Sequence, residues 1–285
     1  MPKQTLYFTQ PADLSLSNGQ LLIRLEDDSE YMRPIEDLRI IIIDHHSVHF
    51  TVPLLTKLSE NKVSVVVCNE SHMPSLMTWD LEANCRQTKF FRGQLEAGAP
   101  MKKQIWKQII ENKIRNQARL LDKLGLCGSR LKPYYSNVKS GDSSNREGMA
   151  AKLYWRTLFG MEFVRDRFAP PPNNMLNYGY ALLRSFAARA IMDAGLLPSI
   201  GVFHKNYYNS FPLVDDMMEP YRPFVDEKVY LLYGDGVCDI DKRCKQELLG
   251  VFYTTLNYEM LSDTAHSLAG IYSKIGNYIV YPNLK

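Results

Sequence analysis

Residues 1–83 carry short runs of β-branched and aromatic residues that are separated by polar turns. Four of these runs predict strands, at residues 5–10, 19–26, 39–50 and 62–69. Between the last two runs, residues 51–62 place apolar side chains at helical spacing behind a Thr-x-Pro start, which predicts one helix. The first part of the chain is therefore expected to be a small β-rich domain.

From residue 84 onward the apolar residues recur at the spacing of a helix. Residues 100–125 carry a broad apolar stripe, with lysines and arginines around the remainder, and glycines end the segment. The stripe consists of Ile105, Trp106, Ile109, Ile110, Ile114, Leu121 and Leu124. Further helices are predicted at 144–159, at 174–194, after Lys242 and around 256–275. We therefore predict an α+β fold, in which an N-terminal β-rich domain (1–83) is followed by a larger all-helical C-terminal domain (84–285).

Charge is distributed unevenly along the chain, although the formal net charge is only +3. The net charge is −6 for residues 1–84, +12 for residues 85–200 and −3 for residues 201–285. A strongly basic middle third is most simply explained by one surface that faces a polyanion. The alternative, a set of solvated helix faces, stays open at this point.

Several classes of protein lose support because their sequence features are missing. No run approaches the roughly 18 apolar residues of a membrane-spanning helix, and the first ten residues lack the pattern of a signal peptide. The five cysteines are scattered and never spaced as CxxC, which favours a reducing cytoplasm. The chain contains no P-loop, GxGxxG, GxSxG or HExxH motif, so the usual indications of nucleotide hydrolysis, hydride transfer, serine hydrolysis and zinc proteolysis are lacking.

The segment NSFPLVDDMMEPYRP (209–223) places three acids in an apolar stretch that prolines open and close. Pro212 suits the first turn of a helix, where the negative charges of Asp215 and Asp216 would interact favourably with the helix dipole. That explanation fails for Glu219, which stands near the other end of the helix, where a negative charge is unfavourable. Glu219 is therefore the acid for which binding of a cation is the better explanation.

Two residues outside this segment are candidates to join it. His204 follows an apolar run, where a lone histidine is more often a core residue, but histidine together with carboxylates suits Mn²⁺ or Mg²⁺. Glu147 stands three residues after Ser144, so it could instead close a capping box at the start of a helix. The residues themselves leave both interpretations of Glu147 open.

A second group of histidines lies near the end of the third predicted strand. It comprises Asp44, His45, His46 and His49. The group lies in the acidic domain and lacks further ligands at a suitable spacing, so we expect polar residues at a strand end rather than a metal site.

Three long segments resemble successive motifs of the CRISPR-associated protein one family, the integrases of CRISPR adaptation. They are REGMAAKLYWRTLFG (146–160), the segment 176–204 that ends in GVFH, and NSFPLVDDMMEPYRPFVD (209–226). The segment KQIIENKIRNQARLL (107–121) is similar to the helix that precedes them in the family. With the β-rich start, the resemblance spans nearly the whole chain, and the form DxMEPYRP looks most like the members that accompany type II systems.

The resemblance implies a divalent metal, Mg²⁺ or Mn²⁺, bound by one Glu, one His and one further acid. Matched motif by motif, these catalytic and metal-binding residues are Glu147, His204 and Glu219. Many members of the family have Asp at the third position, so Asp216 is the second choice for that ligand and Asp215 a further possible acid.

The activity implied by the resemblance is the insertion of short DNA fragments as new spacers. The 3′-hydroxyl ends of a captured double-stranded DNA would attack the CRISPR repeat in a transesterification, and the basic middle third would hold the DNA backbone. The residues expected to contact DNA are Lys102, Lys103, Lys107, Lys113, Arg115, Arg119, Arg146 and Tyr178. For any one tyrosine in this chain, packing in the core remains the usual explanation.

The resemblance also implies partners in a prokaryotic cytoplasm and no membrane. The family forms homodimers through the β-rich domain and assembles with a small second subunit, CRISPR-associated protein two. Type II systems add the effector nuclease and often a DNA-clamp subunit. Two other functions compete with the integrase: a stand-alone nuclease for branched DNA junctions, and a non-catalytic DNA-binding scaffold.

Overall fold

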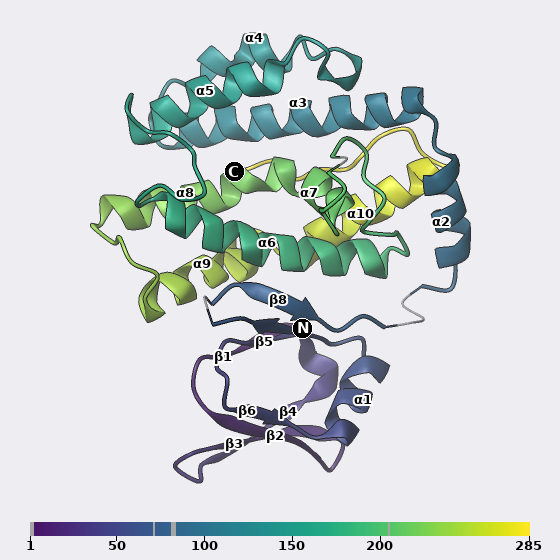
Figure 1. Cartoon of the computed structure of the whole chain (residues 1–285), viewed down its shortest axis with the longest axis vertical. Coiled ribbons are helices and arrows are strands. Elements are labelled where there is room, and N and C mark those ends of the chain that lie inside the picture. The colour runs from purple at the N-terminus through teal and green to yellow at the C-terminus, as the bar shows by residue number, and fades with distance from the viewer. Residues whose placement is uncertain (1–2, 71, 81–83, 205) are drawn as a thin grey trace. The chain divides into compact units, whose positions relative to one another are not determined.

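The computed structural model describes residues 3–70, 72–80, 84–204 and 206–285 of the chain. The chain divides into two compact units, Met1–Ala83 and Asn84–Lys285 (Figure 1). The first unit is rich in strands and the second is helical, so the predicted α+β fold is confirmed. None of the helices in the described part of the chain is long and apolar enough to cross a membrane.

The described strands of the N-terminal unit form two sheets. One sheet has the order β1-β5-β7-β8 and consists of Gln4–Phe8, Leu38–Ile43, Ser64–Cys68 and Pro74–Met77. The other has the order β4-β3-β2-β6 and consists of Glu30–Pro34, Gln20–Leu25, Ala12–Ser17 and Val48–Phe50. The single strand predicted at 39–50 is in fact two strands, because β5 ends at Ile43 and the chain crosses to the other sheet before β6.

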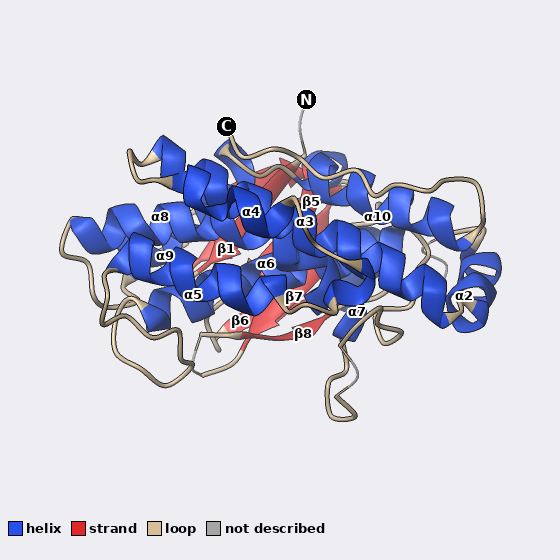
Figure 2. Cartoon of the chain, turned by 90° about the horizontal axis from the view of Figure 1, so that it is seen from above, coloured by secondary structure: helices blue, strands red, loops and turns tan. Residues whose placement is uncertain are grey.

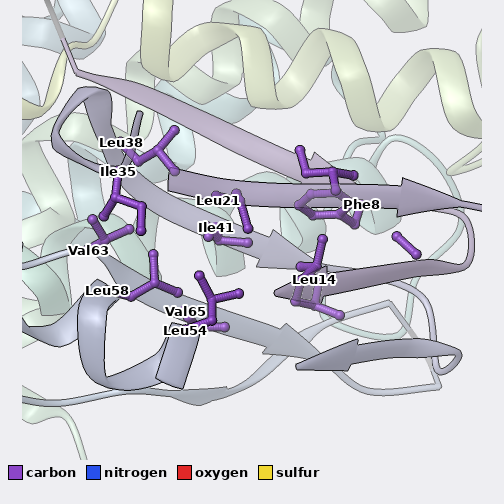
Figure 3. Close-up of a cluster of buried hydrophobic side chains, with 13 residues drawn as sticks. Phe8, Leu14, Leu21, Ile35, Leu38, Ile41, Leu54, Leu58, Val63 and Val65 are labelled. Carbon is purple, nitrogen blue, oxygen red and sulfur yellow. The ribbon is translucent and has the colours of Figure 1, made fainter. Parts of the chain in front are cut away.

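Apolar side chains from both sheets and from α1 (Val52–Glu60) form the core of this unit (Figure 3). Leu54 and Leu58 lie on one face of α1 and are fully buried, as the helical spacing predicted. Ile41 on β5 and Leu21 on β3 are also fully buried. Strand β5 pairs in parallel with β1 and β7 and is buried along almost its whole length, which is why it reads as an uninterrupted apolar run.

The helical unit contains the long helix α3 with shorter helices around it. The helices of this unit are α2 (Gln87–Glu96), α3 (Ala99–Lys123), α4 (Lys132–Tyr135), α5 (Arg146–Phe159), α6 (Asn173–Asp193), α7 (Pro212–Met218), α8 (Arg222–Gly234), α9 (Lys242–Thr254) and α10 (Tyr258–Tyr272). Short 3-10 turns lie at η2 (Gly128–Leu131), η3 (Ser140–Asp142) and η4 (Glu219–Tyr221). At one end of the unit, α2 contacts α10 (Figures 1 and 2).

Helix α3 lies in the middle of the unit, with α4 and α5 on one side and α7, η4 and α8 on the other (Figure 1). The apolar stripe predicted for this segment is buried, except that Leu124 follows the end of the helix and is only half-buried. Asn116, also buried, donates hydrogen bonds to the carbonyls of Pro220 (2.9 Å) and Pro282 (3.2 Å). These bonds fix η4 and the C-terminal segment against α3, so a residue of α3 can lie between α5 and η4.

Candidate active site

Glu147 lies in the first turn of α5, and the start of this helix differs from the predicted capping box. Asn145 is the N-cap residue, and its side chain accepts from the Gly148 amide at 3.2 Å. Asp142 accepts from the amides of Arg146 (2.8 Å) and Glu147 (3.0 Å). Because other side chains satisfy the first amides of the helix, the carboxylate of Glu147 takes no part in capping. The capping-box interpretation of Glu147 is therefore wrong.

The carboxylate of Glu147 instead pairs with Lys113, which also pairs with Glu219. The Lys113 Nζ atom lies 2.6 Å from Glu147 Oε1 and 2.6 Å from Glu219 Oε2. On its other side, Glu219 Oε1 accepts from Arg222 Nη2 at 2.9 Å. The side chains of Glu219 and Lys113 are only 6% and 12% exposed, so this cluster lies largely out of water. Two acidic residues that are 72 positions apart in sequence are thus brought together across one ammonium group.

Glu219 and Lys113 keep their charges at neutral pH although both are largely buried. Burial alone would raise the pKa of Glu219, but Arg222 and Lys113 outweigh it and lower this pKa to about 2. Burial likewise opposes the charge of Lys113, yet Glu219 and Glu147 together raise the pKa of the ammonium above its ordinary value. The cluster is therefore a network of fixed charges, in which each carboxylate faces a cation.

His204 is positioned by the fully buried carboxylate of Asp216 in α7. Asp216 Oδ2 accepts from the amides of Val202 (2.6 Å) and Phe203 (3.0 Å). Its Oδ1 accepts from the His204 amide (3.2 Å) and from the ring nitrogen Nδ1 (2.6 Å). This ring hydrogen bond raises the pKa of His204, although partial burial opposes the shift. Since Nδ1 is held by Asp216, Nε2 is the ring nitrogen left for a ligand.

Two residues that the sequence analysis did not assign to the site also shape the histidine loop. A side chain at Gly201 would place its Cβ 2.7 Å from the His204 carbonyl oxygen and 2.8 Å from Pro212 Cβ. Only glycine allows the backbone to pass this close to Asp216. Trp106 stacks on Phe203 at 4.2 Å and meets the His204 ring edge-on at 5.8 Å. Trp106 was predicted only as part of the core stripe, and Gly201 offered no signal beyond its place in GVFH.

The remaining acid of the 209–223 segment, Asp215, pairs with residues outside the glutamate cluster. Asp215 accepts from Arg184 Nε at 2.7 Å and from Asn209 Nδ2 at 2.7 Å. Asp215 therefore holds Asn209, and Asp216 holds His204. Of the three acids in this segment, Glu219 is the one that lies beside Glu147.

These residues fit a divalent metal in their chemistry, although the structure does not assemble all three predicted ligands. No group of three or more His, Cys, Asp or Glu side chains is close enough to hold a metal ion among the residues described. Glu147 and Glu219 converge on one cationic group, and the charge of His204 contributes to the low pKa of Glu219. Two carboxylates, with an imidazole that is oriented by a further carboxylate, are a donor set that Mg²⁺ or Mn²⁺ accepts.

The structure divides the predicted DNA-contacting residues into three groups. Tyr178 is fully buried in the core, so the prediction that it contacts DNA is wrong. Lys113 is engaged by the two glutamates, and Arg119 donates to Asn116 and Asn283, so neither is a free surface cation. The remaining predicted residues are exposed or half-buried. They are Lys102, Lys103, Lys107, Arg115 and Arg146.

In the histidine group of the N-terminal unit, Asp44 and His49 contact other polar side chains. Asp44 accepts from Tyr7 Oη at 2.6 Å and from His72 Nδ1 at 2.8 Å. His45 and His46 stack on each other. Asp44 directly follows β5, as expected for a polar residue at a strand end.

The substitution Glu219→Gln tests the charge network. At pH 7 we expect it to lower the free energy of unfolding by about 3 kcal/mol, because Lys113 and Arg222 both lose the negative charge of the Glu219 carboxylate. The pKa of Glu219 lies at about 2 in the folded chain, against an ordinary value of 4.5. Its stabilising effect is therefore complete above pH 4.5 and is lost as the pH falls toward 2. Urea unfolding, followed by circular dichroism between pH 7 and pH 3, measures the difference between variant and wild type.

The matched control is Asp235→Asn, which removes an exposed pair with Arg243 at 3.4 Å. We expect no measurable change from this control at any pH. A difference between wild type and Glu219→Gln that stays constant down to pH 3 would contradict the assignment of Glu219 as the ionised centre of the network.

Comparisons with known proteins show which family the chain is similar to. The model of the CRISPR-associated protein Cas1 family matches residues 6–254 of the chain. The CRISPR-associated endonuclease Cas1 of Neisseria meningitidis serogroup C is 37% identical over 285 residues, which cover 98% of this chain and 91% of the relative.

Solved structures share the fold at lower sequence identity. A casposase bound to an integration product has a TM-score of 0.78 and 21% identity, and the match covers 98% of this chain and 92% of that one. A chain of a Cas6-RT-Cas1–Cas2 complex has a TM-score of 0.76 and 19% identity, and the match covers all of this chain and 37% of that one. With a family model matched over most of its length and a close relative aligned almost end to end, the chain belongs to the Cas1 family of CRISPR-associated proteins.

Proposed function

We propose that the chain is a metal-dependent DNA integrase that inserts short DNA fragments into the CRISPR repeat. The observation that carries the proposal is the convergence of Glu147 and Glu219 on one cationic group, beside a histidine that Asp216 orients. Support also comes from the names of its relatives, one called an endonuclease and one a casposase bound to an integration product.

The reaction exchanges one phosphodiester bond for another. The 3′-hydroxyl oxygen of the incoming DNA attacks a phosphorus of the repeat and loses its proton to solvent. The bond from that phosphorus to the 3′ oxygen of the repeat strand breaks, and this oxygen leaves and takes up a proton. Because bonds made and bonds broken are alike, no nucleotide hydrolysis and no protein nucleophile are needed.

Glu147, His204 and Glu219 are the residues that would hold the metal. When bound, Mg²⁺ or Mn²⁺ would supply positive charge at the attacking and leaving oxygens. The chain's own part is to keep these side chains in place beforehand. Arg222 fixes Glu219, Asp216 fixes the His204 ring, and Asn145 with Asp142 leaves Glu147 free to point at the site.

The helical unit would bind the DNA backbone through its basic surface. The net charge of +12 between residues 85 and 200 falls in this unit, and the exposed side chains of Lys103 and Arg115 belong to α3, which also carries Lys113. Contacts of lysine and arginine with phosphates give affinity without reading sequence.

The proposed partners follow from the family and from its relatives. A related chain was solved in a complex with Cas2, so we propose Cas2 as a partner, together with double-stranded DNA. Homodimerisation through the N-terminal unit, a type II effector nuclease and a DNA-clamp subunit remain proposals from the resemblance. A stand-alone junction nuclease would use the same residues, and it would yield cut but never joined DNA. A non-catalytic scaffold is disfavoured because it gives no reason to bury Glu219 beside Glu147.

One prediction of the proposed function concerns strand transfer. In a reaction that joins a short duplex to a plasmid carrying the repeat, Glu147→Gln, His204→Ala and Glu219→Gln should each lower the rate by at least about 10²-fold, because each removes a metal ligand. Gel analysis of joined products in Mg²⁺ or Mn²⁺ measures the rate, and circular dichroism verifies that each variant is folded.

A suitable control is Glu111→Gln, which removes a carboxylate of α3 that pairs only loosely with Lys107, at 3.7 Å. This control should keep the wild-type rate. Wild-type rates in all three ligand variants would refute the site, whereas hydrolysis without joining in the wild type would favour the junction nuclease.

The second prediction concerns DNA affinity. The double variant Lys103→Glu/Arg115→Glu should weaken binding by about tenfold or more for all DNA sequences alike, and the dependence of binding on salt should become shallower. Fluorescence anisotropy between 50 and 200 mM salt, two conditions in which phosphate contacts differ strongly in strength, measures both effects. Lys57→Glu in the N-terminal unit is the control and should leave binding unchanged. If affinity fell for one DNA sequence alone, the basic surface would be reading bases rather than phosphates.

A further inference from the structure

The ammonium group of Lys113 lies where the two glutamates of the site meet. It is 2.6 Å from a carboxylate oxygen of each, and its side chain is only 12% exposed. With Arg222 beside Glu219, the cluster holds two cations and two carboxylates, and its charges balance. The structure therefore contains an internal cation at the point on which the carboxylates converge.

A divalent ion bound to the carboxylate oxygens that contact this ammonium would lie close to it, and the two positive charges would repel each other. Mg²⁺ sits about 2.1 Å from its oxygen ligands, and the oxygens in question are already in contact with Lys113 Nζ. A divalent ion added to a balanced cluster would also leave it with an excess of two positive charges in a largely buried place. One of the two resident cations has to withdraw when the metal binds.

Lys113 is the cation that can withdraw. Arg222 is held on two sides, by Glu219 at 2.9 Å and by the face of the Tyr180 ring, 4.5 Å from its guanidinium carbon. Lys113 carries its charge on a flexible four-carbon stem, and the residue next to it in α3, Ile114, is fully buried and anchors the backbone. The ammonium can therefore leave the carboxylates while α3 stays in place.

We propose that Lys113 is an internal counter-cation, which holds Glu147 and Glu219 together in the metal-free enzyme and is displaced when the divalent ion binds. The inference rests on the proposed metal-dependent function. It gives Lys113 a positioning role in place of a direct contact with DNA. It also means that the resting site binds metal more weakly than its two carboxylates would on their own.

A purely structural ion pair makes a different prediction from a competing cation. If Lys113 only stabilised the fold, its removal would lower stability and leave metal affinity unchanged or reduced. If Lys113 competes with the metal, its removal should lower the stability of the metal-free protein and tighten metal binding. Metal affinity thus separates the two roles without any measurement of activity.

The test is a titration of the full chain with Mn²⁺ in the absence of DNA, with the free ion measured by electron paramagnetic resonance. We expect Lys113→Met to lower the Kd for Mn²⁺ by about tenfold or more. Without metal its melting temperature should lie below that of wild type, and Mn²⁺ should raise it by more than in wild type. The matched control is Lys107→Met on the same helix, whose lysine pairs with Glu111 at 3.7 Å, and its Kd for Mn²⁺ should equal that of wild type.

Three outcomes would count against the inference. An unchanged or higher Kd in folded Lys113→Met would overturn it and leave the proposed function standing. If Lys113→Met and Lys113→Gln both failed to fold without metal, failure of Mn²⁺ to restore the fold would overturn it as well. If neither wild type nor Lys113→Met bound Mn²⁺, metal dependence itself would fail, and the inference with it.

Discussion

Two ionised glutamates can share a largely buried place only when a cation compensates their mutual repulsion, and the rest of the site depends on this constraint. Here Lys113 of α3 supplies the charge, and it joins Glu147 of α5 to Glu219 of η4. The packing of α3 between these two elements is what makes the pairing possible. The buried apolar stripe of α3 and the hydrogen bonds of Asn116 hold that arrangement, so the core of the helical unit and its chemistry are parts of one structure.

Around this pairing, the remaining polar residues divide into those that could bind a ligand and those that hold them. Both carboxylate oxygens of Asp216 accept hydrogen bonds from the loop that carries His204, and Asp215 accepts one from Asn209. Both aspartates thus fix the chain around the site, while Glu147 and Glu219 point into it. A run of acids in the sequence is therefore not a set of equivalent ligands, because the backbone amides around Asp216 take up its charge.

The sequence predicted much of this structure, and the failures have identifiable causes. Runs of β-branched and aromatic residues correctly predicted the β-rich start, and helical spacing of apolar residues predicted the helix α1 and the buried face of α3. These patterns did not show that residues 39–50 form strands in two sheets, because the length of an apolar run does not show where the chain crosses between sheets. Local sequence could not exclude the capping box at Glu147, since Ser144 and Asn145 are both suitable N-cap residues and Lys113, which pairs with the carboxylate, lies 34 positions away. For the same reason Lys113 looked like one more surface lysine.

The most direct test of the account is the position of the metal itself. Crystals of the protein soaked in Mn²⁺ and measured near the manganese absorption edge would locate the ion by its anomalous scattering. The account predicts a single strong peak between the carboxylates of Glu147 and Glu219, within reach of His204 Nε2, with the Lys113 ammonium moved away. A peak elsewhere, or none at all with Lys113 still bridging the two glutamates, would contradict it.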